Sequence, residues 1–158
     1  MRNADRRVVG PLQLRLLRIV ADVNQIYPVP DLRLKGGTAL SAYHLVHRES
    51  RDLDLFAAPS LNASEFGELV REEAEREGVQ MSAVGPASLG YATYLAKLRD
   101  AAVRLDFAAA SSYRLDSFDE TAEGVRIASY ADLCAGKLHA ICDRFAERYF
   151  VDLLVPAG

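Results

Sequence analysis

The sequence predicts an α+β fold in which a mixed β-sheet is flanked by helices. Three observations support this class. An amphipathic helix pattern occupies residues 11–27, short segments of strand type recur between residues 33 and 108, and helical periodicity returns after residue 129. Strands interleaved with helices, with a hairpin among them, indicate one sheet with helices packed on it.

Residues 11–27 form the first predicted helix, and two prolines end it. Its apolar positions recur at helical spacing. They are Leu12, Leu16, Ile19, Val20 and Val23, followed by Pro28 and Pro30.

A short strand at residues 33–35 then leads into a glycine turn. Gly36 and Gly37 have no Cβ atom, so the backbone there can turn sharply and approach a ligand closely. Thr38 is expected to cap a helix over residues 38–46, whose N-terminus would direct unpaired N–H groups at the loop. Such an end favours anions, so a triphosphate could bind there. A tight turn without a ligand is the alternative for this segment alone.

Two carboxylates follow at the strand predicted over residues 53–57. Asp52 and Asp54 are two residues apart, so their side chains project to one face, roughly 6 to 7 Å apart at Cα. Their repulsion raises a pKa unless a cation neutralises it, and Mg²⁺ bound with substrate phosphates would do so. The alternative is an exposed strand face that pairs with Arg48 or Arg51.

The central part of the chain alternates further elements with turns. A charged surface helix at residues 64–77 is closed by Gly78, and strands follow at residues 79–84, 92–98 and 101–108. Arg99 and Asp100 predict a hairpin turn between the last two strands.

The last of these strands supplies a candidate third carboxylate. Its apolar side chains share one face, while Arg104 and Asp106 share the other. Asp106 is therefore expected to face Asp52 and Asp54 from a neighbouring strand. A surface pairing of Arg104 with Asp106 is the alternative.

The chain ends in a predicted helix that starts near Ser129 and Asp132, which resemble a capping box, and runs to about residue 145. Lys137 and Arg144 lie beside its apolar stripe, at the edge of the core. Lys137 could place a point charge against a triphosphate, or its stem could cover the core. The stripe consists of Cys134, Leu138, Ile141 and Phe145.

Composition limits the classes of function. The chain has 158 residues, 50% of them hydrophobic, so we expect a single domain over residues 1–158. A net charge of −3 excludes a global electrostatic grip on nucleic acid, so RNA binding would need a local basic patch. No apolar run could span a membrane and no signal peptide pattern is present, so we expect a cytoplasmic protein without a membrane partner.

Two groups of arginines are candidates for such a basic patch, with solvated helix faces as the alternative. They are Arg2, Arg6, Arg7, Arg15 and Arg18 near the N-terminus, and Arg144 and Arg148 near the C-terminus.

The order and spacing of these segments resemble the signature of AbiEii/AbiGii-type nucleotidyltransferase toxins, including the mycobacterial MenT group. The first part of the likeness is residues 36–40 (GGTAL) and 47–56 (HRESRDLDLF). The second part is residues 129–140 (SYADLCAGKLHA), Arg144, and residues 148–153 (RYFVDL), which resemble a Lys and an Arg ahead of an Arg-aromatic-x-x-Asp motif.

The resemblance implies a polymerase-β-like nucleotidyltransferase fold. It implies transfer of nucleotides from a nucleoside triphosphate to the 3′ end of tRNA by two-metal chemistry, which blocks translation. Asp152 would orient Lys137 or an arginine, or assist proton transfer. The implied catalytic residues are Asp52, Asp54, Lys137 and Asp152; the nucleotide-binding residues are Gly36, Gly37, Thr38 and Lys137; and the Mg²⁺ ligands are Asp52, Asp54 and Asp106.

The resemblance also implies a cognate antitoxin as a partner. In some members of the family the antitoxin resembles a kinase that modifies a hydroxyl group in the glycine motif. Thr38 occupies that position here.

Three other classes of protein share features with this sequence. A haloacid-dehalogenase-like phosphatase also uses Asp-x-Asp, but its first Asp ends a strand, whereas Leu55 and Phe56 continue the strand here. Nucleotidyl transfer to a protein target and a catalytically silent nucleotide-binding module stay open as alternatives.

Overall fold

The described part of the chain contains a mixed sheet. The computed structural model describes residues 1–46 and 48–143, with side chains up to residue 140, and seven strands of this part form one sheet in the order β3-β4-β5-β2-β1-β7-β6. Two neighbouring pairs, β2 with β5 and β1 with β7, are parallel, and the remaining pairs are antiparallel. The strands are β1 (Arg33–Lys35), β2 (Asp52–Ala57), β3 (Gln80–Ala83), β4 (Tyr91–Leu98), β5 (Ala101–Ala109), β6 (Asp119–Glu120) and β7 (Arg126–Ile127).

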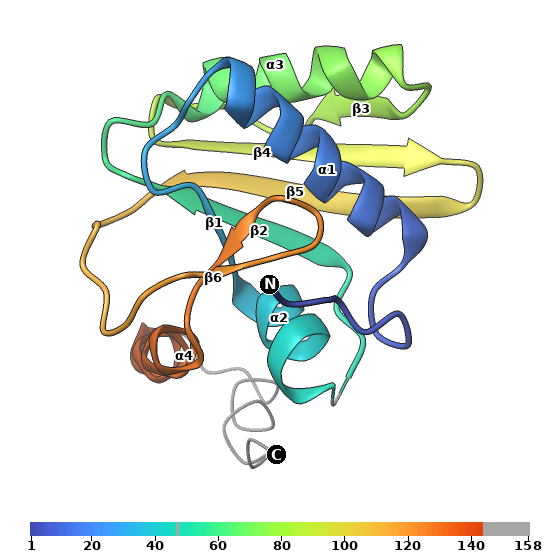
Figure 1. Cartoon of the computed structure of the whole chain (residues 1–158). Helices are drawn as coiled ribbons and strands as arrows, with labels where there is room; N and C mark the ends of the chain where they lie inside the picture. The colour runs from blue at the N-terminus through green and yellow to red at the C-terminus, as the bar shows by residue number, and fades with distance from the viewer. Residues whose placement is uncertain (47, 144–158) are drawn as a thin grey trace.

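Helices lie in two places around this sheet (Figure 1). Helices α1 (Pro11–Ile26) and α3 (Ala63–Arg76) pack against the strands, and α1 crosses in front of them. Helix α2 (Gly36–Leu40), the π-helical turn η1 (Ser41–Leu45) and helix α4 (Tyr130–Asp143) lie at the other end of the molecule. Among the described helices, none combines the length and apolar character needed to cross a membrane.

The two faces of the central strands differ in chemistry because successive side chains alternate. Leu53, Leu55, Leu105 and Phe107 are completely buried on the face that packs against α1 and α3. Each such side chain contributes roughly 1.5–3 kcal/mol through burial. The opposite face of β2 and β5 carries the predicted carboxylates, and we call it the carboxylate face.

Most predicted elements are confirmed, including the helix at residues 11–27, the strands around residues 33–35 and 53–57, and the hairpin at Arg99, which has φ 54°. Asn62 caps α3 by accepting a hydrogen bond from the backbone N–H of Glu65 at 3.3 Å. Strands β6 and β7 were not predicted, because two residues each are too short to show periodicity.

The helix after the glycine turn differs from its prediction. It begins at Gly36 rather than Thr38, and it changes to π-helical geometry at Ser41. Thr38 is not an N-cap: its side chain is 1% exposed, and its hydroxyl donates to the backbone carbonyl of Asp52. The helix can start earlier because Gly36 adopts φ 70°, which glycine tolerates without steric cost.

Helix α4 starts as predicted but buries a different stripe. The Ser129 hydroxyl accepts a hydrogen bond from the N–H of Asp132 at 3.1 Å, so the predicted cap is confirmed. The predicted stripe is wrong at Leu138, which is 57% exposed, whereas Leu133 and Lys137 are buried. The side chains at 141 and 145 lie outside the described part. Lys137 faces inward because its charge lies close to the carboxylates described below.

Candidate functional site

The glycine turn lies directly against the carboxylate face. At Gly36 a Cβ atom would stand 1.8 Å from Oδ2 of Asp54, a distance that no side chain could accommodate. At Gly37 a Cβ atom would stand 2.9 Å from Nη2 of Arg48 and 3.0 Å from Oγ of Ser50. Gly36 is therefore required by the close approach of the Asp54 carboxylate and by its φ of 70°, whereas a side chain at Gly37 would only need Arg48 and Ser50 to shift.

Strand pairing aligns the predicted residues in one row across the sheet. Asp54 of β2 lies opposite Lys35 of β1 on one side and opposite Asp106 of β5 on the other. Asp106 in turn lies opposite Thr93 of β4. Partners in register share a face, so Asp106 faces Asp54 from the neighbouring strand, as predicted.

Asp54 is the most strongly perturbed of these carboxylates. Its pKa is raised to about 6, first by burial and then by the negative charges of Asp106 and Asp52. The positive charges of Lys137 and Arg104 limit this rise. Four charged groups from two strands and a distant helix therefore act on Asp54.

The structure does not show the alternative given for Asp52 and Asp54, which was pairing with Arg48 or Arg51. The ion pairs of the described residues include neither carboxylate, so neither is neutralised by Arg48 or Arg51. Asp52 is exposed and Asp54 is largely buried on the same face of β2. Two neighbouring carboxylates without an ion-pair partner are suited to bind a cation.

Asp106 makes the contact that was given as the alternative to metal binding, a pairing with Arg104. Its Oδ1 accepts hydrogen bonds from the hydroxyls of Thr93 and Tyr91, and Arg104 lies 3.1 Å from its Oδ2. Asp106 thus pairs with Arg104 while it also acts on Asp54 from the opposite strand. Sequence reasoning missed Tyr91 and Thr93, because only the β4–β5 register brings them to Asp106.

The donor set fits a hard divalent cation. Asp52, Asp54 and Asp106 offer carboxylate oxygens, the ligands that Mg²⁺ prefers, and the pKa of Asp54 is raised first by its burial and then by the two neighbouring carboxylates. Within residues 1–46 and 48–143, no three His, Cys, Asp or Glu side chains are yet gathered closely enough to hold a metal. In this structure the oxygens of Asp106 bond to Tyr91, Thr93 and Arg104.

Lys137 reaches this site from α4. Its side chain is 8% exposed, and its positive charge lowers the pKa of Asp54 against the effect of burial. A buried ammonium beside a carboxylate cluster is suited to bind phosphate. Asp152, Arg144 and Arg148 lie outside the described residues, so their predicted roles stay predictions.

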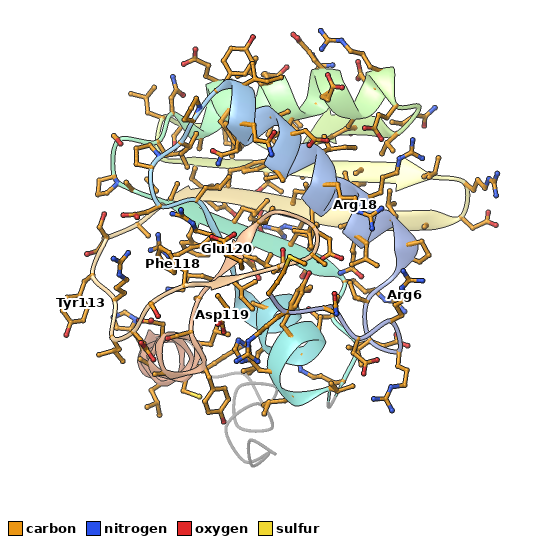
Figure 2. All side chains as sticks on the ribbon, viewed as in Figure 1. Arg6, Arg18, Tyr113, Phe118, Asp119 and Glu120 are labelled. Atoms are coloured by element: carbon orange, nitrogen blue, oxygen red, sulfur yellow. The ribbon has the colours of Figure 1, made fainter. Side chains whose placement is uncertain are left out.

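The N-terminal arginines form the predicted basic patch only in part, because Arg6, Arg15 and Arg18 line one pocket at α1 together with Asp22 and Glu77. Arg2 pairs with Asp119 at 2.6 Å, Arg7 with Asp5 at 2.7 Å, and Arg15 with Glu77 at 3.0 Å. Arg6 and Arg18 lie on the side of α1, far from Tyr113 and Phe118 (Figure 2). The cations that neighbour the carboxylates are Lys35, Arg104 and Lys137.

Comparison with solved structures identifies the fold. The chain aligns with JHP933 from Helicobacter pylori with a TM-score of 0.64 and 17% identity, over 95% of this chain and 66% of that one. A second H. pylori protein aligns with a TM-score of 0.61 and 21% identity, over 89% of this chain and 65% of that one. ANT(2″)-Ia in complex with adenylyl-2″-tobramycin aligns with a TM-score of 0.54 and 17% identity, over 91% and 87%.

These identities are low, so the alignments show the fold alone, and the predicted polymerase-β-like nucleotidyltransferase fold is confirmed. The chain spans just under two thirds of the length of the two H. pylori proteins. None of the curated protein sequences matches it.

A sequence profile identifies the family. The profile described as nucleotidyl transferase AbiEii toxin of a type IV toxin–antitoxin system matches residues 26–155, which is most of the chain. The matched region contains the glycine turn, the carboxylates of β2 and β5, and Lys137. The chain therefore belongs to the AbiEii family of nucleotidyltransferase toxins.

Proposed function

We propose that this protein is a cytoplasmic toxin that transfers a nucleotide from a nucleoside triphosphate to the 3′ end of tRNA and thereby blocks translation. The observation that supports this most directly is the environment of Asp54. Its buried carboxylate lies against Gly36 and responds to Asp52, Asp106 and Lys137. A glycine turn, three carboxylates and a buried lysine are the groups that nucleotidyl transfer needs.

In this proposal Asp52, Asp54 and Asp106 would hold Mg²⁺. The ion, when bound, neutralises the carboxylates and the phosphates and makes the attacking hydroxyl more acidic. Asp106 would have to turn from Tyr91 and Arg104 to join the set.

The phosphates of the triphosphate would lie between the glycine turn and α4. Gly36 and Gly37 let the backbone approach the phosphates, and Lys137 supplies a point charge from the other side. Arg48, whose guanidinium lies beside Gly37, is a further phosphate ligand that sequence reasoning did not select.

The chemical step balances as a displacement at the α-phosphorus. The 3′ hydroxyl oxygen of the RNA forms a bond to that phosphorus, and the bond from the phosphorus to the bridging oxygen of the β-phosphate breaks. Pyrophosphate leaves with the bonding electrons, and the hydroxyl proton passes to a carboxylate of the cluster. Holding both reactants in line supplies much of the rate enhancement.

A cognate antitoxin of kinase type would act on Thr38. Its hydroxyl is buried and donates to the carbonyl of Asp52, so a phosphate there requires the turn to open. The added negative charge would lie beside Asp54 and Asp52 and repel the triphosphate. This gives a physical reason why modification of Thr38 would inactivate the toxin.

The experiment is one incubation of the protein with Mg²⁺, each of the four triphosphates labelled at the α-phosphate, and either total RNA or total protein. We expect label on tRNA, and none with Asp54→Ala. Asp100→Ala, which removes an exposed carboxylate at the β4–β5 turn, is the matched control and should retain activity. Label on protein alone would replace the RNA proposal with the protein-target alternative, and no label on either would favour the silent nucleotide-binding module.

A further inference from the structure

A strip of cations and aromatic rings leads away from the carboxylates on their own face. Lys35 lies opposite Asp54 and places its ammonium 5.3 Å from the centre of the Phe56 ring. Arg33, two residues earlier on β1, lies opposite Phe56 and therefore on the same face. The strip continues into the loop at residues 110–118 and consists of Lys35, Phe56, Arg33, Phe118, Arg114 and Tyr113.

The ring of Phe118 joins β1 to this loop. The guanidinium of Arg33 lies 5.4 Å from the ring centre, and that of Arg114 lies 4.9 Å from it. Both distances are within the range of cation–π attraction. Arg33 is 3% exposed, whereas the Arg114 side chain is 49% exposed, so the stack runs from the interior to solvent.

The loop is held at both ends by buried or half-buried polar side chains. Arg33 donates to the carbonyl of Ser111 at 3.0 Å. The Asp132 carboxylate of α4 accepts from the N–H of Leu115 at 2.8 Å and of Asp116 at 3.4 Å. Between these anchors Tyr113 is 79% exposed and points away from the molecule (Figure 2).

The loop is thus fixed while its large side chains contact solvent. Tyr113 and Leu115, which is 56% exposed, present two large side chains to solvent from the same fixed loop. A loop that is held in place and exposes an aromatic ring is typical of a binding surface. Its conformational entropy is already lost in the free protein, so binding a ligand does not carry that cost.

The positive charge of the strip favours an anionic ligand. Arg33 and Lys35 have lowered pKa values, mainly because they are buried and, for Lys35, because Arg33 adds a second positive charge. Neither forms an ion pair within the described residues. Asp31, which pairs with Arg114 at 3.8 Å, and Asp132 offset part of this positive charge, and an anionic ligand would offset more of it, even though the whole chain carries a charge of −3.

We propose that this strip binds the single-stranded 3′ end of the RNA acceptor, with bases stacked on Tyr113 and the plane of Arg114, and phosphates beside Lys35 and Arg114. This inference rests on the proposed function. Stacking surfaces combined with a line of cations are the means by which proteins bind single strands. Asp132 and Lys137 lie five residues apart on α4, or about 7.5 Å along its axis, so the loop anchor is close to the lysine that acts on Asp54.

The experiment measures binding of a labelled single-stranded RNA of about ten nucleotides to the full chain, without triphosphate. The double variant Tyr113→Ala/Arg114→Ala should bind this RNA about tenfold more weakly or worse. The slope of log affinity against log salt should fall by about 1, because one phosphate contact is lost.

A matched control removes the same side chains elsewhere. Tyr27→Ala/Arg76→Ala deletes an exposed tyrosine just after α1 and an exposed arginine at the end of α3, and it should bind RNA like the wild type. All four positions are exposed, so thermal melts should show that both double variants stay folded.

The results of these binding experiments distinguish a failure of the strip as an RNA site from a failure of the proposed nucleotide transfer. Equal RNA affinity in both double variants, or no binding of RNA by the wild type, overturns the strip as an RNA site. Weaker binding of the triphosphate with unchanged RNA binding would assign the strip to the nucleobase of the donor, and loss of antitoxin binding alone would assign it to that partner. A wild type that binds RNA through the strip but transfers no nucleotide would reject the transferase and leave the strip in place.

Discussion

Replacement of Asp54 by asparagine should stabilise the folded protein at neutral and alkaline pH. Asp54 is a largely buried carboxylate whose pKa is raised to about 6 by burial and by the charges of Asp106 and Asp52. Asparagine has nearly the same shape and carries no charge. Asp54→Asn therefore removes the penalty of a buried charge and keeps the packing against Gly36.

The magnitude follows from the linkage between proton binding and folding. Between about pH 4 and 6 the folded chain binds more protons than the unfolded chain at Asp54, so the free energy of unfolding falls as the pH rises through this window. A pKa that rises from 3.8 to about 6, at about 1.4 kcal/mol for each pH unit, corresponds to about 3 kcal/mol. In the wild type, the charge on Asp54 lowers the free energy of unfolding by this full amount above the pKa of Asp54 in the folded protein, and by nothing below about pH 4.

Urea unfolding of wild type and Asp54→Asn at several pH values measures this difference. We expect the variant to be more stable by up to about 3 kcal/mol near pH 7.5 and equal to the wild type near pH 4. Asp100→Asn, on the exposed β4–β5 turn, is the matched control. An Asp54→Asn variant that is less stable near pH 7.5, or a difference that does not change with pH, would refute the reasoning.

Three further substitutions test other parts of the site. Lys137→Ala should weaken triphosphate binding in a calorimetric titration and raise the pKa of Asp54 further in an NMR titration; if neither changes, the lysine stem only covers the core. Gly36→Ala should cost about 2 kcal/mol or more in urea unfolding, because its Cβ would stand 1.8 Å from Asp54 at φ 70°, and wild-type stability would contradict this. Thr38→Val should cost about 1–3 kcal/mol by leaving the carbonyl of Asp52 without its donor. Thr38→Ser keeps the hydroxyl and should recover most of that loss.

Much of the fold could be predicted because its signals are local. Helix α1 repeats its apolar side chains at helical spacing, and from Ala102 to Ala108 strand β5 alternates buried residues with exposed or half-buried ones. The actual start of α2 at Gly36 could not be predicted, since the Thr38 hydroxyl does not cap the helix but bonds to β2, fourteen residues away in sequence. Helix α4 was predicted with the wrong buried stripe because hydrophobicity alone does not indicate that Lys137 is turned toward Asp54.

The candidate site also combines residues that local sequence signals indicate with residues that only tertiary contacts bring together. Asp52, Asp54 and the glycine turn are adjacent in sequence, and strand alternation is enough to place the two carboxylates on one face. Asp106 could be selected by its alternation on β5, and the parallel register with β2 confirms that it faces Asp54. Tyr91, Thr93 and the strip from Lys35 to Tyr113 carry no sequence signal, because their members meet only through strand pairing and the Arg33–Phe118 contact.

The most direct measurement of the central claim compares two labels on the same triphosphate. The wild type is incubated with Mg²⁺, RNA and a triphosphate labelled at either the α- or the γ-phosphate, in parallel with Asp54→Ala. We predict that the α-label becomes covalently attached to RNA with the wild type alone, and that the γ-label is released as pyrophosphate. Transfer of the γ-label to any acceptor, or an equal α-label on RNA with Asp54→Ala, would contradict a nucleotidyltransferase site built on Asp54 and the glycine turn.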